Sequence, residues 1–95
     1  MNSQDVNLQI VALEQLKLEL ENFVKDLDMR SKSYYEHVKA LANLDVNFAQ
    51  NYDQQYWRQD YSMIQSLKQH LQNTDIKFVM QAIDGAKVAL SKYKQ

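Results

Sequence analysis

The sequence predicts an all-α protein, folded as an antiparallel helical hairpin with a long first helix. The 95 residues include one glycine and no proline, so little in the chain marks the turns that would separate β-strands. Hydrophobic residues make up 45% of the chain, and they recur at helical spacing instead of alternating. A chain of this length forms one domain, residues 1–95, with a modest core.

The first helix is expected to begin near residue 4, because Asn2 or Ser3 can cap it and Asp5 suits the positive end of its dipole. An apolar side chain then recurs every seven residues, at Val6, Leu13, Leu20, Leu27, Tyr34 and Leu41. Leu16, Phe23, Val24 and Val38 lie between these positions. This pattern is typical of a coiled-coil seam. It predicts one helix of about 38 residues, about 57 Å long.

Two places could interrupt the helices. Arg30 and Ser31 take seam positions within 28–33, so a break in the first helix there is the alternative. Residues 41–47 lose the repeat and contain Asn43 and Asp45, which suit turns and caps. The hairpin turn is therefore expected at 41–47.

The second helix is expected to run from about Phe48, and its apolar stripe changes face near Asn73. On a helical wheel the apolar set after Asn73 is rotated by about 110° from the set before it. Either Thr74 caps a separate last helix, or the helix continues and presents a different face. A fold-back at Asn73 would give the alternative architecture, a compact three- or four-helix bundle.

The second helix carries the most aromatic stretch of the chain. Placed on an ideal α-helix, its large side chains span roughly 220°, and one partner helix covers about half of such an arc. The stripe therefore predicts a protein interface, either within the chain or with a partner. The residues expected in a partner interface are Phe48, Tyr52, Tyr56, Trp57, Asp60, Tyr61, Ile64, Leu67 and Leu71.

Composition and charge argue against several other classes of function. The formal net charge is −1, which offers no general attraction to nucleic acid. There is no cysteine, and the two histidines have no metal-ligand spacing. We expect no cofactor, no metal, no small-molecule substrate, no nucleic-acid partner, no membrane span and no enzymatic activity.

Two polar pairs could nevertheless carry chemistry. Arg30 and His37, with six residues between them, resemble the Arg-x(4 to 6)-His motif of HEPN-type ribonucleases, although a polar heptad pair on a helix is the simpler interpretation. Asp53 and Asp60 both project within the aromatic stripe, and paired carboxylates can perform acid-base work. The favoured interpretation is structural: a carboxylate at a seam position fixes the register or pairs with a basic or tyrosyl side chain of a facing helix.

The charge distribution favours the antiparallel arrangement. Residues 1–30 contain six acidic and three basic side chains, and residues 75–95 contain two acidic and four basic ones. A hairpin brings these oppositely charged segments together. The attraction favours this register more than it adds stability, because exposed ion pairs contribute about 0 to 1 kcal/mol.

The second helix opens with the run FAQNYDQQY, residues 48–56. With the hairpin architecture, this run resembles the WXG-like proteins of bacterial type VII secretion. Leu44, Asp45 and Val46 stand where that family has its Trp-x-Gly turn, and Tyr56 with Asp60 fits the spacing of its export signal within a helix. The small α-helical proteins associated with LXG toxins resemble the family in shape without that turn motif.

The resemblance implies a targeting factor or chaperone for a type VII secreted LXG-type toxin, acting by binding another helical protein. We expect a homodimer or heterodimer that uses the aromatic helix face. The location expected is cytoplasmic, or outside the cell after export without a cleavable signal peptide. The alternative function is a bacterial or phage immunity protein or antitoxin that inhibits a toxin as a compact helical bundle.

Overall fold

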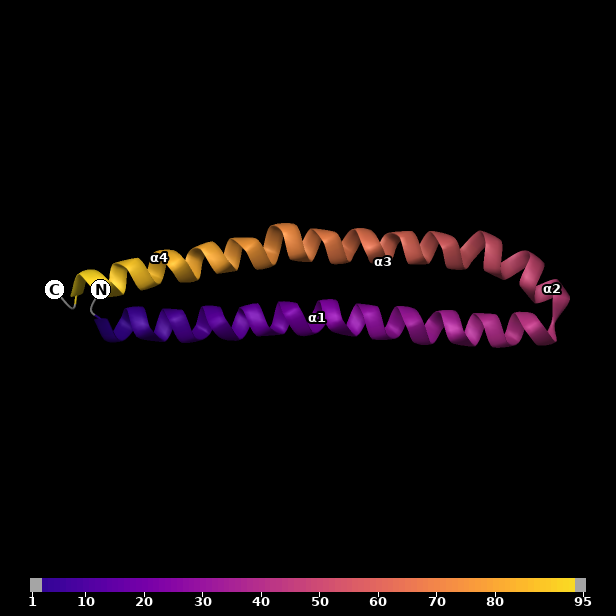
Figure 1. Ribbon diagram of the computed structural model, residues 1–95, viewed down its shortest axis with the longest axis horizontal. Helices are drawn as coiled ribbons and strands as arrows, with labels where there is room; N and C mark the ends of the chain where they lie inside the picture. The colour runs from indigo at the N-terminus through magenta and orange to yellow at the C-terminus, as the bar shows by residue number, and fades with distance from the viewer. Residues whose placement is uncertain (1–2, 94–95) are drawn as a thin grey trace. The chain divides into compact units, whose positions relative to one another are not determined.

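The computed structural model describes the backbone of residues 3–93 and their side chains except those of 53–55. Every described residue except Asp45 is helical. The elements along the chain are α1 (Ser3–Leu44), α2 (Val46–Phe48), the π-helical stretch η1 (Ala49–Trp57), α3 (Arg58–His70), the π-helical stretch η2 (Leu71–Ile76) and α4 (Lys77–Tyr93). Figure 1 labels the α-helices.

The contacts within the chain group into two units. The turn unit is Val24–Gln69, and the terminal unit is Met1–Phe23 together with His70–Gln95. In each unit, part of α1 lies antiparallel to the returning helix (Figure 1). The predicted all-α antiparallel hairpin is therefore confirmed. The single domain expected for residues 1–95 stays a prediction.

The first helix is continuous, as the seven-residue repeat predicts. α1 spans 42 residues without interruption, so the alternative break at 28–33 is wrong. Ser31 is 7% exposed, which shows that a small polar residue is accommodated in the seam. The helix begins at Ser3, while the alternative cap Asn2 lies outside the described residues.

The seam of α1 contains the expected repeat from Val6, but the second set of buried positions beside that repeat differs in part from the expected set. Val6, Ile10, Val24 and Val38 are all less than 10% exposed. Leu16 and Phe23, which the sequence places in the seam, are 48% and 51% exposed. Ile10, Val24, Ser31 and Val38 differ by multiples of seven and lie three or four residues from the repeat that begins at Val6, but Leu16 and Phe23 fit the same 3-4 spacing on the other flank of that repeat. The returning helix covers the flank with Ser31, so the packing of the two helices decides which set is buried.

The turn is made by Asp45, inside the expected 41–47 segment. Its backbone is extended, with φ −136° and ψ 106°, and its carboxylate accepts a hydrogen bond from the Phe48 backbone N–H at 3.1 Å. The backbone N–H of Asp45 also donates to the Leu41 carbonyl at 2.9 Å. Asp45 thus ends one helix and caps the next, which is the role in which aspartate is strongly preferred.

The returning chain does not break at Asn73. η2 joins α3 to α4 without a loop, so the compact bundle that a fold-back would create is not the observed architecture. A π-helical turn contains an extra residue, and one extra residue offsets the following helix face by about 100°. This offset accounts for the change of face that the sequence shows at Asn73. Leu71 and Ile76, the apolar residues before and after Asn73, are five residues apart.

The terminal unit has an aliphatic core. Its buried hydrophobic residues are Val6, Ile10, Leu71, Val79 and Ile83. The described ends of α1 and α4 lie side by side, as Figure 1 shows. The Lys87 ammonium lies 3.9 Å from the Glu14 carboxylate, so the antiparallel pairing brings at least one pair of opposite charges together as predicted.

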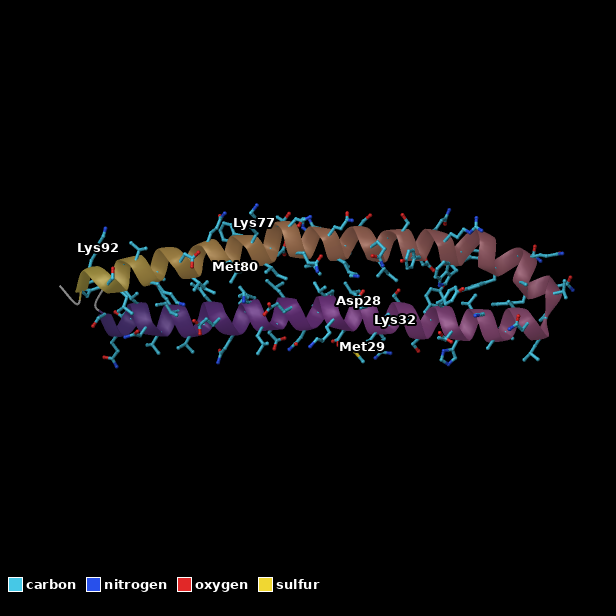
Figure 2. All side chains as sticks on the ribbon, in the orientation of Figure 1. Asp28, Met29, Lys32, Lys77, Met80 and Lys92 are labelled. Carbon is cyan, nitrogen blue, oxygen red and sulfur yellow. The ribbon has the colours of Figure 1, made fainter. Side chains whose placement is uncertain are left out.

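The turn unit has a smaller aliphatic core and more polar and aromatic contacts. Val24 and Val38 are its buried hydrophobic residues. Asp28 on α1 points toward the returning helix, while Met29 points away from it (Figure 2). Asp28 forms an ion pair with Lys68 of α3, whose side chain is 16% exposed.

Candidate protein-binding surfaces

The aromatic stripe lies mostly on η1 and the start of α3. The Phe48 and Tyr52 rings are half-buried and stack at 4.8 Å, and Tyr56 follows at 5.3 Å from Tyr52 with 53% of its surface exposed. The π-helical stretch separates these residues from those of α3. The 220° arc calculated for an ideal α-helix is therefore wider than the surface that the side chains occupy.

Asp60 is held by a tyrosine of the facing helix. The Tyr34 hydroxyl donates to Asp60 Oδ2 at 2.8 Å, and the Tyr52 hydroxyl lies 2.7 Å from the Tyr34 oxygen. Since Tyr34 has one proton and gives it to Asp60, Tyr52 must donate to Tyr34. Burial raises the pKa of the Tyr34 hydroxyl well above its usual value, and the hydrogen bonds with Tyr52 and Asp60 raise this pKa further. The structural interpretation of Asp60 is confirmed.

Trp57 lies between two tyrosines. Its ring centroid is 4.9 Å from that of Tyr35 on α1 and 4.9 Å from that of Tyr61 on α3. Tyr35 and Tyr61 are 41% and 42% exposed, and Trp57 is half-buried. The three rings, with Ser31, Lys32 and Glu36, line an open hollow of about 520 Å³ in the turn unit. We call Tyr35, Trp57 and Tyr61 the aromatic shelf.

The other expected interface residues differ in accessibility. Ile64 is half-buried and Leu67 is 40% exposed, both in the turn unit. Leu71 is 8% exposed and belongs to the core of the terminal unit. Tyr56, Tyr61 and Leu67 thus offer the most surface to a partner, whereas Leu71 packs within its own chain.

The terminal unit has an apolar groove that sequence reasoning missed. Two adjoining hollows share Leu16, and they measure about 530 Å³ and about 350 Å³. Their walls are Gln9, Ala12, Leu13, Leu16 and Leu20 of α1, with Thr74, Asp75, Phe78, Val79, Ala82 and Ala86 of the returning helix. We call this surface the alanine groove. Phe78 and Leu16 rise from it, 72% and 48% exposed.

The opposite side of the terminal unit is charged. Glu14, Lys17, Glu21, Asp84 and Lys87 surround its hollow. At 100° per residue, these residues lie on the other side of the helix pair from the alanine groove. Lys17 and Glu21 lie 3.6 Å apart. The two sides of this unit therefore differ sharply in polarity.

The structure describes the surroundings of some of the polar side chains considered for catalysis. His37 Nδ1 lies 2.7 Å from the Ser33 carbonyl, and because a carbonyl only accepts, Nδ1 must carry a proton. Arg30 is exposed, one heptad away on the same helix. The side chain of Asp53 lies outside the described residues. Across the side chains that are described, no three His, Asp or Glu residues gather closely enough to hold a metal ion.

Within residues 3–93, no helix combines the length and apolar content needed to cross a membrane. Comparison of the chain with protein-family models, curated proteins and solved structures found no match. The described contacts are therefore the basis for the proposal that follows.

Two signals in the sequence could have revealed more of these surfaces. Ile10, Val24 and Val38 share a seven-residue spacing that marks the second seam register. Phe78, Ala82 and Ala86 recur every four residues, which puts them on one helix face. Alanine contributes little to a hydrophobic pattern, so this face is easily overlooked.

Proposed function

We propose that this protein is a non-enzymatic helical partner protein that binds another helical protein. The observation that carries the proposal is the exposure of large side chains on the aromatic stripe of the turn unit. Tyr56, Tyr61 and Leu67 are 53%, 42% and 40% exposed.

Much of this exposed surface is apolar. Large hydrophobic side chains that are more than 60% exposed are Leu8, Met29, Leu44, Val46, Met63 and Phe78. In each unit, the two helices pack against each other along one seam, and their outer faces remain uncovered. Exposed apolar side chains that gather on one face can form an interaction site.

We propose that the helical partner binds the turn unit, on the aromatic shelf and its neighbours Tyr56 and Leu67. Tyrosine and tryptophan are enriched among residues that dominate binding energy, since a rigid ring buries a large area at little entropic cost. Lys32 and Glu36 at the rim of the hollow provide polar groups around an apolar centre, the arrangement typical of interfaces. An amphipathic helix fits this surface.

The partner that the resemblance to WXG-like proteins suggests is the N-terminal helical region of an LXG-type toxin, for which this chain would act as targeting factor or chaperone. Location in the cytoplasm, with or without later export, is part of the same proposal. It rests on the resemblance of residues 48–56, on the helical hairpin and on the exposed aromatic residues.

Co-expression with the helical region of a neighbouring toxin gene tests the proposal. Light scattering coupled to size-exclusion chromatography should give the mass of a complex that contains both chains. Tyr61→Ala should weaken that complex, since Tyr61 is exposed and stacks on Trp57. Met29→Ala is the matched control, because Met29 is exposed and points away from the returning helix (Figure 2). Failure of any such toxin region to bind would contradict the proposal.

A further inference from the structure

Two charged residues border the aromatic shelf. Lys32 and Glu36 line the same hollow as Tyr35, Trp57 and Tyr61, and both are exposed. They lie four residues apart on α1, the spacing at which opposite charges can pair along a helix. Among the side chains that the structure describes, neither of them takes part in an ion pair. The shelf therefore carries an available ammonium and an available carboxylate at its edge.

The same spacing gives a different result in the terminal unit. Lys17 and Glu21 repeat the order of lysine and glutamate four residues apart on α1, and their charged groups lie 3.6 Å apart. The charges of Lys17 and Glu21 are thus directed at each other, whereas those of Lys32 and Glu36 remain open to another molecule. Available charges beside an apolar surface can select a partner by electrostatic complementarity.

We propose that the helix bound on the aromatic shelf carries one acidic and one basic side chain four residues apart, the acidic one facing Lys32 and the basic one facing Glu36. This inference rests on the proposed function, because it names the chemistry of the helical partner. All α-helices rise by the same distance per residue. A spacing of four residues on the partner therefore matches the spacing on α1 when the two helices run side by side.

The charges provide specificity more than affinity. Exposed ion pairs contribute little to binding energy, whereas like charges brought together disfavour a wrong partner. A helix with two acidic or two basic residues at these positions would place one like-charged pair at the edge of the shelf in either direction. A helix with one of each avoids this in one direction only. It has the acidic residue first if it runs parallel to α1, and the basic residue first if it runs antiparallel.

Two synthetic helices test the proposal through the fluorescence of Trp57, the single tryptophan of the chain. Both are tryptophan-free amphipathic peptides of about 21 residues, long enough to be helical in isolation, and they share one apolar face. The Glu/Lys peptide has glutamate and lysine four residues apart at the edge of that face, and the Lys/Lys peptide has lysine at both positions. Titration of each peptide measures a dissociation constant.

Lys32→Glu should reverse the preference between the peptides. The wild type should bind the Glu/Lys peptide roughly fivefold more tightly, and Lys32→Glu should favour the Lys/Lys peptide by a similar factor. A variant that failed to fold would bind neither peptide, so it could not produce a reversal. Glu36→Lys, tested with a Glu/Glu peptide, gives the same comparison with the opposite charge. High salt should reduce each preference.

Lys17→Glu is the matched control. It changes the net charge by the same amount as Lys32→Glu and also leaves two glutamates four residues apart on α1. It therefore measures the general effect of added negative charge, and it should keep the preference of the wild type.

Three outcomes would overturn the proposal. The wild type could bind neither peptide, it could bind both equally, or Lys17→Glu could reverse the preference as fully as Lys32→Glu does. The proposed function is judged separately with the toxin region. A toxin region that binds the wild type and Lys32→Glu equally would contradict the charge pairing and leave the toxin-partner function standing. Peptides that behave as expected, while no toxin region binds, would do the reverse.

Discussion

The two units of this chain pair their helices by different chemistry. Among the side chains that the structure describes, the terminal unit holds five buried aliphatic residues, while the turn unit holds two and adds the hydrogen bonds of Tyr34 and the stacking around Trp57. Aliphatic contacts have no preferred direction, whereas hydrogen bonds and ring contacts do. The difference teaches that directional contacts favour one register of the two helices within the turn unit, whereas the helices of the terminal unit are held mainly by less directional aliphatic contacts.

The largest expected effect tests the aliphatic side of this comparison. Leu71→Ala should lower the free energy of unfolding by about 3 kcal/mol, because it leaves a cavity in the terminal core. Leu67→Ala is the control, and it should cost less than about 1 kcal/mol since Leu67 is 40% exposed. Urea denaturation at a fixed protein concentration, followed by circular dichroism, measures both. Equal losses would contradict the assignment of Leu71 to the core.

The next effect tests the aromatic side. Trp57→Ala should lower the free energy of unfolding by about 2 kcal/mol, less than for a fully buried tryptophan, because Trp57 is half-buried between Tyr35 and Tyr61. Tyr56→Ala, at a more exposed position, should cost less than about 1 kcal/mol. Thermal unfolding at equal concentrations compares them. If Trp57→Ala left stability unchanged, the ring would serve binding alone.

A smaller effect concerns the hydroxyl network. Tyr34→Phe removes the donor to Asp60 and the acceptor for Tyr52, which should cost about 1 to 2 kcal/mol. Tyr56→Phe serves as the matched control. A loss equal to that of the control would show that the hydroxyl network does not fix the register.

The same variant gives a pH dependence. The pKa of Tyr34 is raised in the folded state, first by burial and then by its hydrogen bonds, while an unfolded tyrosine ionises near pH 10. The stabilisation from Tyr34 is therefore complete below about pH 10 and declines as the pH rises above it. The difference in unfolding free energy between the wild type and Tyr34→Phe should shrink in that range. A constant difference up to the highest accessible pH would contradict it.

The smallest effect compares two ion pairs. Lys68→Met should cost about 1 kcal/mol, because the Lys68 side chain is mostly buried against Asp28. Lys87→Met should cost less than about 0.3 kcal/mol, because both Lys87 and Glu14 are more than half exposed. Denaturation at low and high salt should show a salt-dependent difference for Lys68→Met. The reverse order would mean that the terminal unit depends more on charge than its aliphatic core suggests.

Much of the fold follows from the sequence for identifiable reasons. The repeat from Val6 to Leu41 predicts α1, and Asp45 lies where the polar residues predict the turn. A basic or tyrosyl partner for Asp60 was expected because a carboxylate at a seam position faces the other helix, and Tyr34 is that partner. These features depend either on the local spacing of apolar residues or on the need of a single side chain, such as Asp45 or Asp60, for a hydrogen-bond partner.

Other features depend on information that local patterns do not contain. Leu16 and Phe23 are more hydrophobic than Ser31, yet Ser31 is buried and they are exposed, because they lie on the opposite flank of the seven-residue repeat. No residue type marks a π-helical turn. The change of face at Asn73 is an indirect sign of η2, and it gives no sign of η1. The alanine groove exists because α4 and α1 lie together, and neither segment shows it alone.

Sedimentation equilibrium of the unmodified chain over a wide range of concentrations tests the central claim most directly. The claim is that the apolar surface left outside the two helix seams is an interface. It predicts a mass that rises above 11.2 kDa as the concentration increases or when a toxin helical region is added. A mass that stayed at 11.2 kDa throughout, with no change when a toxin helical region is added, would contradict it.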